Sequence, residues 1–161
     1  WWTTGSRRVA TMLHGMAATS ATREAENGGE FLKAIASQTG IRAHVISGTE
    51  EGRLIHMAAV YGLGLSGETA VVVDIGGGSV EITHGAGPAI DMGRSFKVGV
   101  IRLTERFVKS DPLTKRDERK LVKHLSTELD EYLRRIAKAG YDQTLATGFA
   151  AQAKIERTGG L

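Results

Sequence analysis

The middle of the chain carries an apolar run at residues 70–73 that ends in Asp74-Ile75 and leads directly into three glycines. A continuous apolar run of this kind is typical of a strand that is buried on both faces. The segment after the glycines, residues 79–83, alternates as the second strand of a hairpin does. The pattern therefore predicts a buried strand, a glycine turn and a returning strand in this part of the chain.

The same segment predicts a phosphate site that includes a cation. The glycines at 76–78 have no Cβ atoms, so their backbone N–H groups can surround phosphate oxygens closely. Asp74 and Glu81 flank the loop, and Mg²⁺ prefers one or two carboxylates together with phosphate oxygens and water. The alternative is a tight hairpin in which the glycines serve only the turn and the acids face solvent.

The remaining segments predict an α/β fold with a hairpin-rich second half, because helical and strand-like patterns alternate along the chain. Asn27, Thr49 and Thr114 are the expected N-caps of three helices. Residues 62–68 indicate a hinge or a boundary between lobes. Helices are expected at about residues 27–40, 49–62, 98–108 and 114–139, and further strands at 17–20, 43–46, 89–92 and 145–148.

Two further polar segments could carry chemistry. In residues 19–24 small hydroxyl residues precede Arg23, whose planar guanidinium could bind phosphate oxygens, although a surface arginine in an ordinary connection is the alternative. In residues 47–51 two acids begin a predicted helix. Acids in a first helical turn usually complement the helix dipole. The functional alternative is that Glu51 orients a water as general base.

Composition excludes several classes of protein. The chain of 161 residues has no cysteine, which excludes disulfide scaffolds and thiolate metal sites. Its net charge of +3, from 21 Lys and Arg against 18 Asp and Glu, is too small to argue for nucleic acid. No stretch approaches the ~20 apolar residues of a membrane span. No apolar segment follows Arg7 and Arg8, so no signal peptide is expected, which is compatible with the cytoplasm.

Taken in order, five motifs of the chain resemble the exopolyphosphatase and guanosine pentaphosphate phosphohydrolase (Ppx/GppA) family. They run from about residue 17 to 140 with compatible spacings. The matching segments are Ala-Thr-Ser-Ala-Thr-Arg-Glu-Ala-Glu-Asn at 18–27, Ile-Ser-Gly-Thr-Glu-Glu-Gly-Arg-Leu at 46–54, Asp-Ile-Gly-Gly-Gly-Ser-Val-Glu at 74–81, Gly-Val-Ile-Arg-Leu-Thr-Glu-Arg-Phe at 99–107 and Asp-Pro-Leu-Thr at 111–114.

This resemblance implies an actin/Hsp70/sugar-kinase-like fold of two ribonuclease-H-like lobes, with residues 1–66 in the first lobe and 67–161 in the second. It implies Mg²⁺-dependent release of terminal phosphate from inorganic polyphosphate, or of the 5′ γ-phosphate from guanosine pentaphosphate. Members are often dimers, which makes a homodimer an expectation. The resemblance assigns roles as follows: Glu51 is the general base, Arg23, Gly76, Gly77, Gly78 and Ser79 bind phosphate, and Asp74 and Glu81 are the acids around the metal.

The chain departs from the family pattern at several places. Position 52 is Gly where the family usually has Ala, and position 80 is Val where Thr is common. The N-terminal Asp-x-Gly-Ser-Asn-Ser hairpin is absent, and residues 146–150 only partly match the family's second phosphate loop. The actin-like fold is therefore expected to be incomplete in this chain. Two alternatives stay open: an inactive phosphate- or nucleotide-binding module of the same fold, and a sugar-kinase- or Hsp70-like ATPase.

Overall fold

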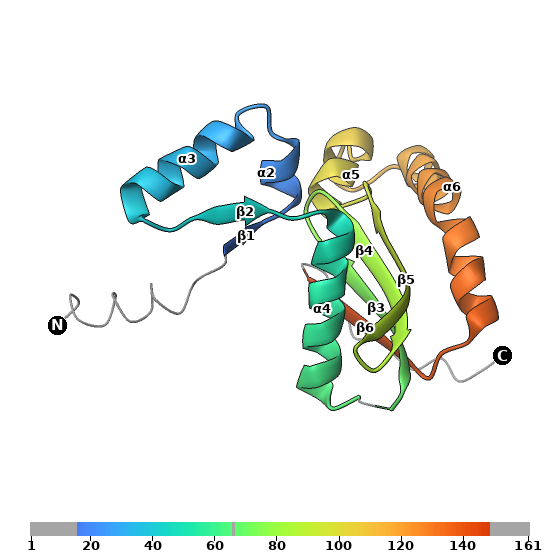
Figure 1. Ribbon diagram of the computed structural model, residues 1–161. Helices are drawn as coiled ribbons and strands as arrows, with labels where there is room; N and C mark the ends of the chain where they lie inside the picture. The colour runs from blue at the N-terminus through green and yellow to red at the C-terminus, as the bar shows by residue number, and fades with distance from the viewer. Residues whose placement is uncertain (1–15, 66, 149–161) are drawn as a thin grey trace. The chain divides into compact units, whose positions relative to one another are not determined.

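The computed structural model describes residues 16–65 and 67–148 (Figure 1). The chain forms two compact units, the first ending at Ser47 and the second beginning at Gly48. The helix that begins at Gly48 therefore groups with the second unit. The lobe boundary expected near residue 66 concerns a two-lobed protein and stays a prediction.

The first unit is a parallel strand pair with a helical crossover. Strands β1 and β2 pair in parallel, with Met16 opposite Ala43 and Ala18 opposite Val45. Parallel strands need a crossover connection of this kind, and the chain provides it as two helices. In order, the elements are β1 (Met16–Ala18), α2 (Ser20–Glu24), α3 (Gly28–Thr39) and β2 (Ala43–Val45).

The second unit is built on a four-stranded sheet with the order β5-β4-β3-β6. Strands β3, β4 and β5 form an antiparallel meander, and β6 returns parallel to β3 after two helices (Figure 1). In chain order, the elements are α4 (Gly48–Leu63), β3 (Thr69–Ile75), β4 (Val80–Ala86), β5 (Ala89–Phe96), α5 (Val100–Phe107), α6 (Lys115–Ala139) and β6 (Gln143–Gly148).

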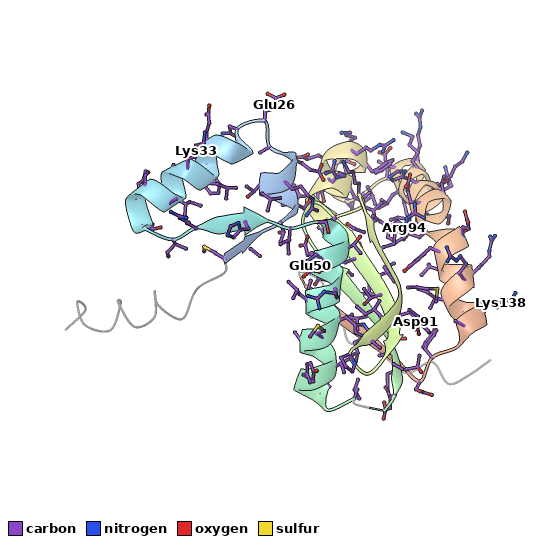
Figure 2. The ribbon with its side chains drawn as sticks, viewed as in Figure 1. Glu26, Lys33, Glu50, Asp91, Arg94 and Lys138 are labelled. Atoms are coloured by element: carbon purple, nitrogen blue, oxygen red, sulfur yellow. The ribbon has the colours of Figure 1, made fainter. Side chains whose placement is uncertain are left out.

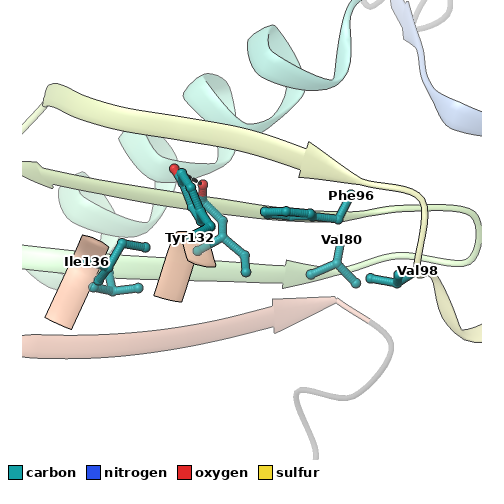
Figure 3. Packing of buried hydrophobic residues seen from close by; sticks show 7 residues of the cluster. Val80, Phe96, Val98, Tyr132 and Ile136 are labelled. Atoms are coloured by element: carbon teal, nitrogen blue, oxygen red, sulfur yellow. Dashed lines mark hydrogen bonds between the residues drawn. The ribbon is translucent and has the colours of Figure 1, made fainter. Parts of the chain in front are cut away.

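One face of this sheet packs against α6. Tyr132 and Ile136 of that helix are buried against the strands, and the Tyr132 ring meets the Phe96 ring edge to face (Figure 3). The Tyr132 hydroxyl donates a hydrogen bond of 3.2 Å to the Ile82 carbonyl. The core on this side is therefore largely apolar, and the Tyr132 hydroxyl within it is satisfied.

The opposite face of the sheet packs against α4. His56 of α4 is fully buried, and its two ring nitrogens lie 2.9 Å from the Thr83 hydroxyl and 3.1 Å from the Gly87 carbonyl. Val60 of the same helix is buried as well. These contacts fix α4 along the sheet, with its first turn at the end of the strands where β3 and β4 meet the glycine loop.

Most of the expected elements are confirmed, with shifts of a few residues at their ends. Thr114 caps α6 as expected, since its hydroxyl accepts a hydrogen bond of 3.1 Å from the Asp117 N–H. The expectation for Thr49 was wrong, because α4 begins at Gly48 and encloses it. The strand expected at 89–92 extends to Phe96, which places Ser95 within the sheet.

Candidate phosphate site

A row of four polar residues crosses the second-unit sheet at one end. Asp74 of β3 lies opposite Glu81 of β4, and Glu81 lies opposite Ser95 of β5. On the other side, Asp74 lies opposite Thr147 of β6. Directly opposed residues in a sheet share a face and lie within reach of one another. The register therefore brings both acids predicted from the sequence together, beside two hydroxyl residues.

The two acids are neighbouring like charges, of which Glu81 is buried and Asp74 is half-buried. Glu81 is 2% exposed, and its Oε1 atom accepts a hydrogen bond of 2.6 Å from the Ser95 hydroxyl. Its Oε2 atom is buried and has no hydrogen-bond partner among the described residues. Burial, and then the nearby charge of Glu81, raise the pKa of Asp74 above its ordinary value. A cation at this position would relieve both effects.

The glycine loop at 76–79 is held by its carbonyl groups. The loop closes with a hydrogen bond of 3.0 Å from the Gly76 N–H to the Ser79 carbonyl. The first amides of α5 bind the loop carbonyls, with Val100 N–H to Gly76 at 3.0 Å and Ile101 N–H to Gly77 at 2.9 Å. We call these hydrogen bonds from α5 to the loop carbonyls the loop clamp. Because they hold the carbonyl groups, they also fix the direction of the amide groups in the same loop.

Two further residues tighten this clamp. The Arg102 side chain donates from Nε to the Gly78 carbonyl at 3.0 Å. Gly99 passes so close to the loop that a Cβ atom would collide with the Gly77 carbonyl. The N–H groups of Gly77 and Gly78 donate to no backbone carbonyl of residues 16–65 and 67–148. The loop thus offers backbone donors of the type that bind phosphate oxygens.

The end of β6 also reaches this place. Gly148 has a φ angle of 92°, in the left-handed region that favours glycine. A Cβ atom there would lie 2.9 Å from Oδ1 of Asp74 and would collide with the Ile75 carbonyl. Residues 146–148, which matched the expected second phosphate loop only in part, therefore end against Asp74. Residues 149 and 150 of that segment lie outside the described residues.

The first turn of α4 separates the roles of its two acids. Glu50 makes a two-point ion pair with Arg53, with distances of 2.7 and 2.8 Å, and lies on the outer side of the helix (Figure 2). The hydrogen bond from Arg53 lowers the pKa of Glu50, which makes its carboxylate a weaker base. Glu51 is half-buried and precedes Gly52, whose backbone packs against the Glu81 side chain. Of the two acids, Glu51 is the better candidate for chemistry.

Arg23 belongs to the first unit. It lies in α2, and its Nη1 atom donates a hydrogen bond of 2.7 Å to the carbonyl of Ile46, just after β2. This bond fixes the guanidinium at the carboxyl ends of the two parallel strands, where ligands bind in open α/β sheets. Of the residues predicted from the sequence, Arg23 alone lies in the first unit; Glu51, Asp74, Glu81 and the loop 76–79 share the second.

The donor set fits a hard divalent cation. Among the described residues there is no group of three or more His, Cys, Asp or Glu side chains that could hold a metal. Mg²⁺ does not need one, because it is usually held by one or two carboxylates plus substrate phosphates and water. Asp74 and Glu81 supply two carboxylates beside a phosphate-type loop, and the unpartnered Oε2 atom of Glu81 is a buried oxygen that a cation would satisfy.

Sequence reasoning missed three residues of the site. Ser95 escaped because β5 was expected to end near Met92, although the alternation through residue 96 indicates the longer strand. Gly99 begins the motif at 99–107, but nothing in one sequence reveals its close approach to the loop. The position of Gly148 against Asp74 depends on the parallel pairing of β6 with β3, which local patterns do not predict.

The fold belongs to the actin-like class. The structure of a PilM–PilN type IV pilus biogenesis complex matches over 79% of this chain and 41% of its own, with a TM-score of 0.52 and 20% identity, which shows the fold alone. The expected fold class is therefore confirmed. Among the described residues, no helix has the length and apolar character needed to cross a membrane.

Closer similarities identify the family. The profile of the Ppx/GppA phosphatase family matches residues 15–158, and the chain belongs to this family. Exopolyphosphatase 1 of Mycobacterium leprae is 33% identical over 143 residues, which cover 88% of this chain and 42% of that protein. Exopolyphosphatase 2 of Mycobacterium tuberculosis is 42% identical over 104 residues, which cover 62% of this chain and 32% of that protein.

Solved structures agree with this assignment. The Aquifex aeolicus PPX-GPPA enzyme matches with a TM-score of 0.68 and 30% identity, over 88% of this chain and 48% of its own. An exopolyphosphatase from Cytophaga hutchinsonii matches with a TM-score of 0.77 and 26% identity over the same shares. The chain thus spans less than half the length of these relatives.

Proposed function

We propose that this chain carries part of the active site of an exopolyphosphatase, which releases orthophosphate from the end of an inorganic polyphosphate chain. The observation that carries the proposal is the pairing of half-buried Asp74 with buried Glu81 at the clamped glycine loop. Membership of a phosphatase family, with relatives named exopolyphosphatase, supports the choice of substrate. Guanosine pentaphosphate, which ends in a similar phosphoanhydride, is the second substrate to test.

In the proposed reaction a water oxygen forms a bond to the terminal phosphorus while the phosphoanhydride P–O bond breaks. Glu51 accepts a proton from that water, and the electron pair of the broken bond stays on the shortened chain. The amides of Gly77, Gly78 and Ser79 donate to the oxygens of the terminal phosphate. Arg23 of the first unit is a further phosphate-binding residue that the family resemblance implies. Asp74 and Glu81 would hold Mg²⁺, which when bound neutralises charge on the phosphate oxygens.

The alternative function is a catalytically inactive module that binds phosphate or a nucleotide. The acids Glu51, Asp74 and Glu81, which match the family motifs, favour the enzyme over this module. An ATPase of the sugar-kinase or Hsp70 type is disfavoured by the motifs at 18–27 and 46–54, which match the phosphatase family. A homodimer remains an expectation of the resemblance, and a cytoplasmic location remains an expectation from the sequence.

The first experiment measures orthophosphate release by the complete gene product, with polyphosphate and with guanosine pentaphosphate. We expect release that stops with excess chelator and returns with added Mg²⁺, because the paired carboxylates need a cation to accept an anionic substrate. If hydrolysis persisted in excess chelator, the reaction would not need a divalent cation and this part of the proposal would be wrong. Binding of polyphosphate without any release would favour the inactive module.

Replacing Arg23 by Ala is expected to raise KM for polyphosphate about tenfold or more, because a guanidinium–phosphate hydrogen bond contributes roughly 1.5–3 kcal/mol. Arg23→Lys should recover only part of the loss, since an ammonium cannot bind two oxygens with a planar fork. The exposed Arg42 of the same unit gives the control Arg42→Ala, which should change neither KM nor kcat. Equal values for Arg23→Ala and the wild type would make Arg23 a surface residue.

A further inference from the structure

Ser95 completes the polar row on the side away from Asp74. It lies opposite Glu81 in the β4–β5 ladder, while Asp74 lies opposite Glu81 in the β3–β4 ladder. The three side chains therefore share the face of the sheet that packs against α4. Ser95 does not belong to the predicted loop, the predicted acids or the predicted base.

Among residues 16–65 and 67–148, the Ser95 hydroxyl is the one hydrogen-bond partner of the Glu81 carboxylate. Its length of 2.6 Å is that of a bond to a charged acceptor. Glu81 is 2% exposed, so water does not offer competing hydrogen bonds at Oε1. A buried carboxylate with one donor takes its orientation from that donor, because any other rotamer would leave both oxygens unsatisfied.

The first turn of α4 encloses this pair. A Cβ atom at Gly48 would collide with Cβ and Oγ of Ser95, and one at Gly52 would lie 3.3 Å from Cβ of Glu81. The helix can therefore lie this close to Ser95 because position 48 is glycine, and a Cβ atom at position 52 would make a tight contact with Glu81. Gly52 thus leaves room for the Glu81 side chain beneath it.

We propose that Ser95 is a positioning residue for the metal-binding pair: its hydroxyl holds Oε1 of Glu81 and so leaves Oε2 to face the cation beside Asp74. The inference rests on the proposed function, in that it assumes a divalent cation between Asp74 and Glu81. Groups that orient a metal ligand typically change metal affinity 10–100-fold when they are removed, by general experience with such groups. Ser95 acts on the cation only through Glu81.

The test is the affinity of the complete gene product for Mn²⁺, measured without substrate by calorimetry or by the EPR signal of free Mn²⁺. Ser95→Ala is expected to weaken Mn²⁺ binding by about 10–100-fold. Ile82→Val is the matched control, since Ile82 neighbours Glu81 in β4 but points into the opposite, apolar core. It should leave Mn²⁺ affinity unchanged, and thermal unfolding of all variants identifies any that fail to fold.

A double-mutant cycle separates positioning from general damage. In a Glu81→Gln background, Ser95→Ala should cause little further loss, because the carboxylate that Ser95 orients is gone. Two results would overturn the role of Ser95 and leave the proposed function standing. In the first, folded Ser95→Ala binds Mn²⁺ as tightly as the wild type does. In the second, Ser95→Ala lowers Mn²⁺ affinity equally in the wild-type and Glu81→Gln backgrounds. Absence of Mn²⁺ binding by the wild type would overturn the cation of the proposed function, and the inference with it.

Discussion

Replacing Glu51 by Gln is expected to lower kcat for polyphosphate hydrolysis by about 10²–10⁴-fold, the usual contribution of a positioned general base. The amide keeps the size of the side chain and its hydrogen-bonding reach but cannot accept the proton of the attacking water. KM should change little, because the phosphate donors are elsewhere, on the loop 76–79 and Arg23. Single-turnover and steady-state rates of phosphate release measure the effect.

The neighbouring acid provides the control for this experiment. Glu50→Gln removes the same charge from the same helical turn and breaks the exposed ion pair with Arg53. Such pairs contribute little to stability, so Glu50→Gln should retain nearly full activity. If Glu50→Gln and Glu51→Gln lost activity equally, the effect would come from the charge of the helix terminus rather than from a base.

Replacing Asp74 by Asn is expected to lower activity by at least about 100-fold, because charge stabilisation by a bound metal amounts to several kcal/mol and each 1.36 kcal/mol is a factor of ten. The same change is expected to stabilise the protein in the absence of divalent cations. Burial and the charge of Glu81 raise the pKa of Asp74 above 3.8, so the folded state binds this proton more tightly than the unfolded state.

The sign of the pH dependence follows from that difference. Ionised Asp74 destabilises the folded state, fully so above its raised pKa and not at all below its ordinary value of 3.8. The melting temperature of Asp74→Asn should therefore exceed that of the wild type at pH 7, and the gap should close as the pH falls towards 4. Thermal unfolding of both proteins, measured with chelator between pH 7 and pH 4, checks this expected difference in melting temperature. A variant that is less stable at pH 7 would show that Asp74 makes favourable contacts instead.

The local patterns of the sequence predicted most of the fold. The glycine loop between β3 and β4, the stop of α3 at Gly40 and the cap of α6 at Thr114 all depend on residues close in sequence. Strand ends were less certain, because the alternation that defines β5 continues through polar residues such as Arg94 and Ser95. Partial patterns of this kind are decided by pairing with a neighbouring strand, which one sequence does not display.

The candidate site divides in the same way. The pairing of Asp74 with Glu81 follows from the hairpin and could be predicted from the length of the glycine turn. The clamp on the loop could not be predicted from the sequence. It joins residues 76–78 to the start of α5, and β4 and β5 separate these two segments along the chain. The ion pair of Arg53 with Glu50, which leaves Glu51 as the better candidate base, was also hidden, since the sequence does not show which acid Arg53 binds.

The meander of the sheet has a consequence for how such a site can vary. Ser95, Glu81 and Asp74 lie on three consecutive strands, whereas Thr147 returns to the side of β3 only after an excursion through α5 and α6. The acidic centre is thus encoded within a short, continuous module. Segments of the excursion that do not clamp the loop, such as the connection between α5 and α6, can change in length and charge while the chemistry next to them is kept.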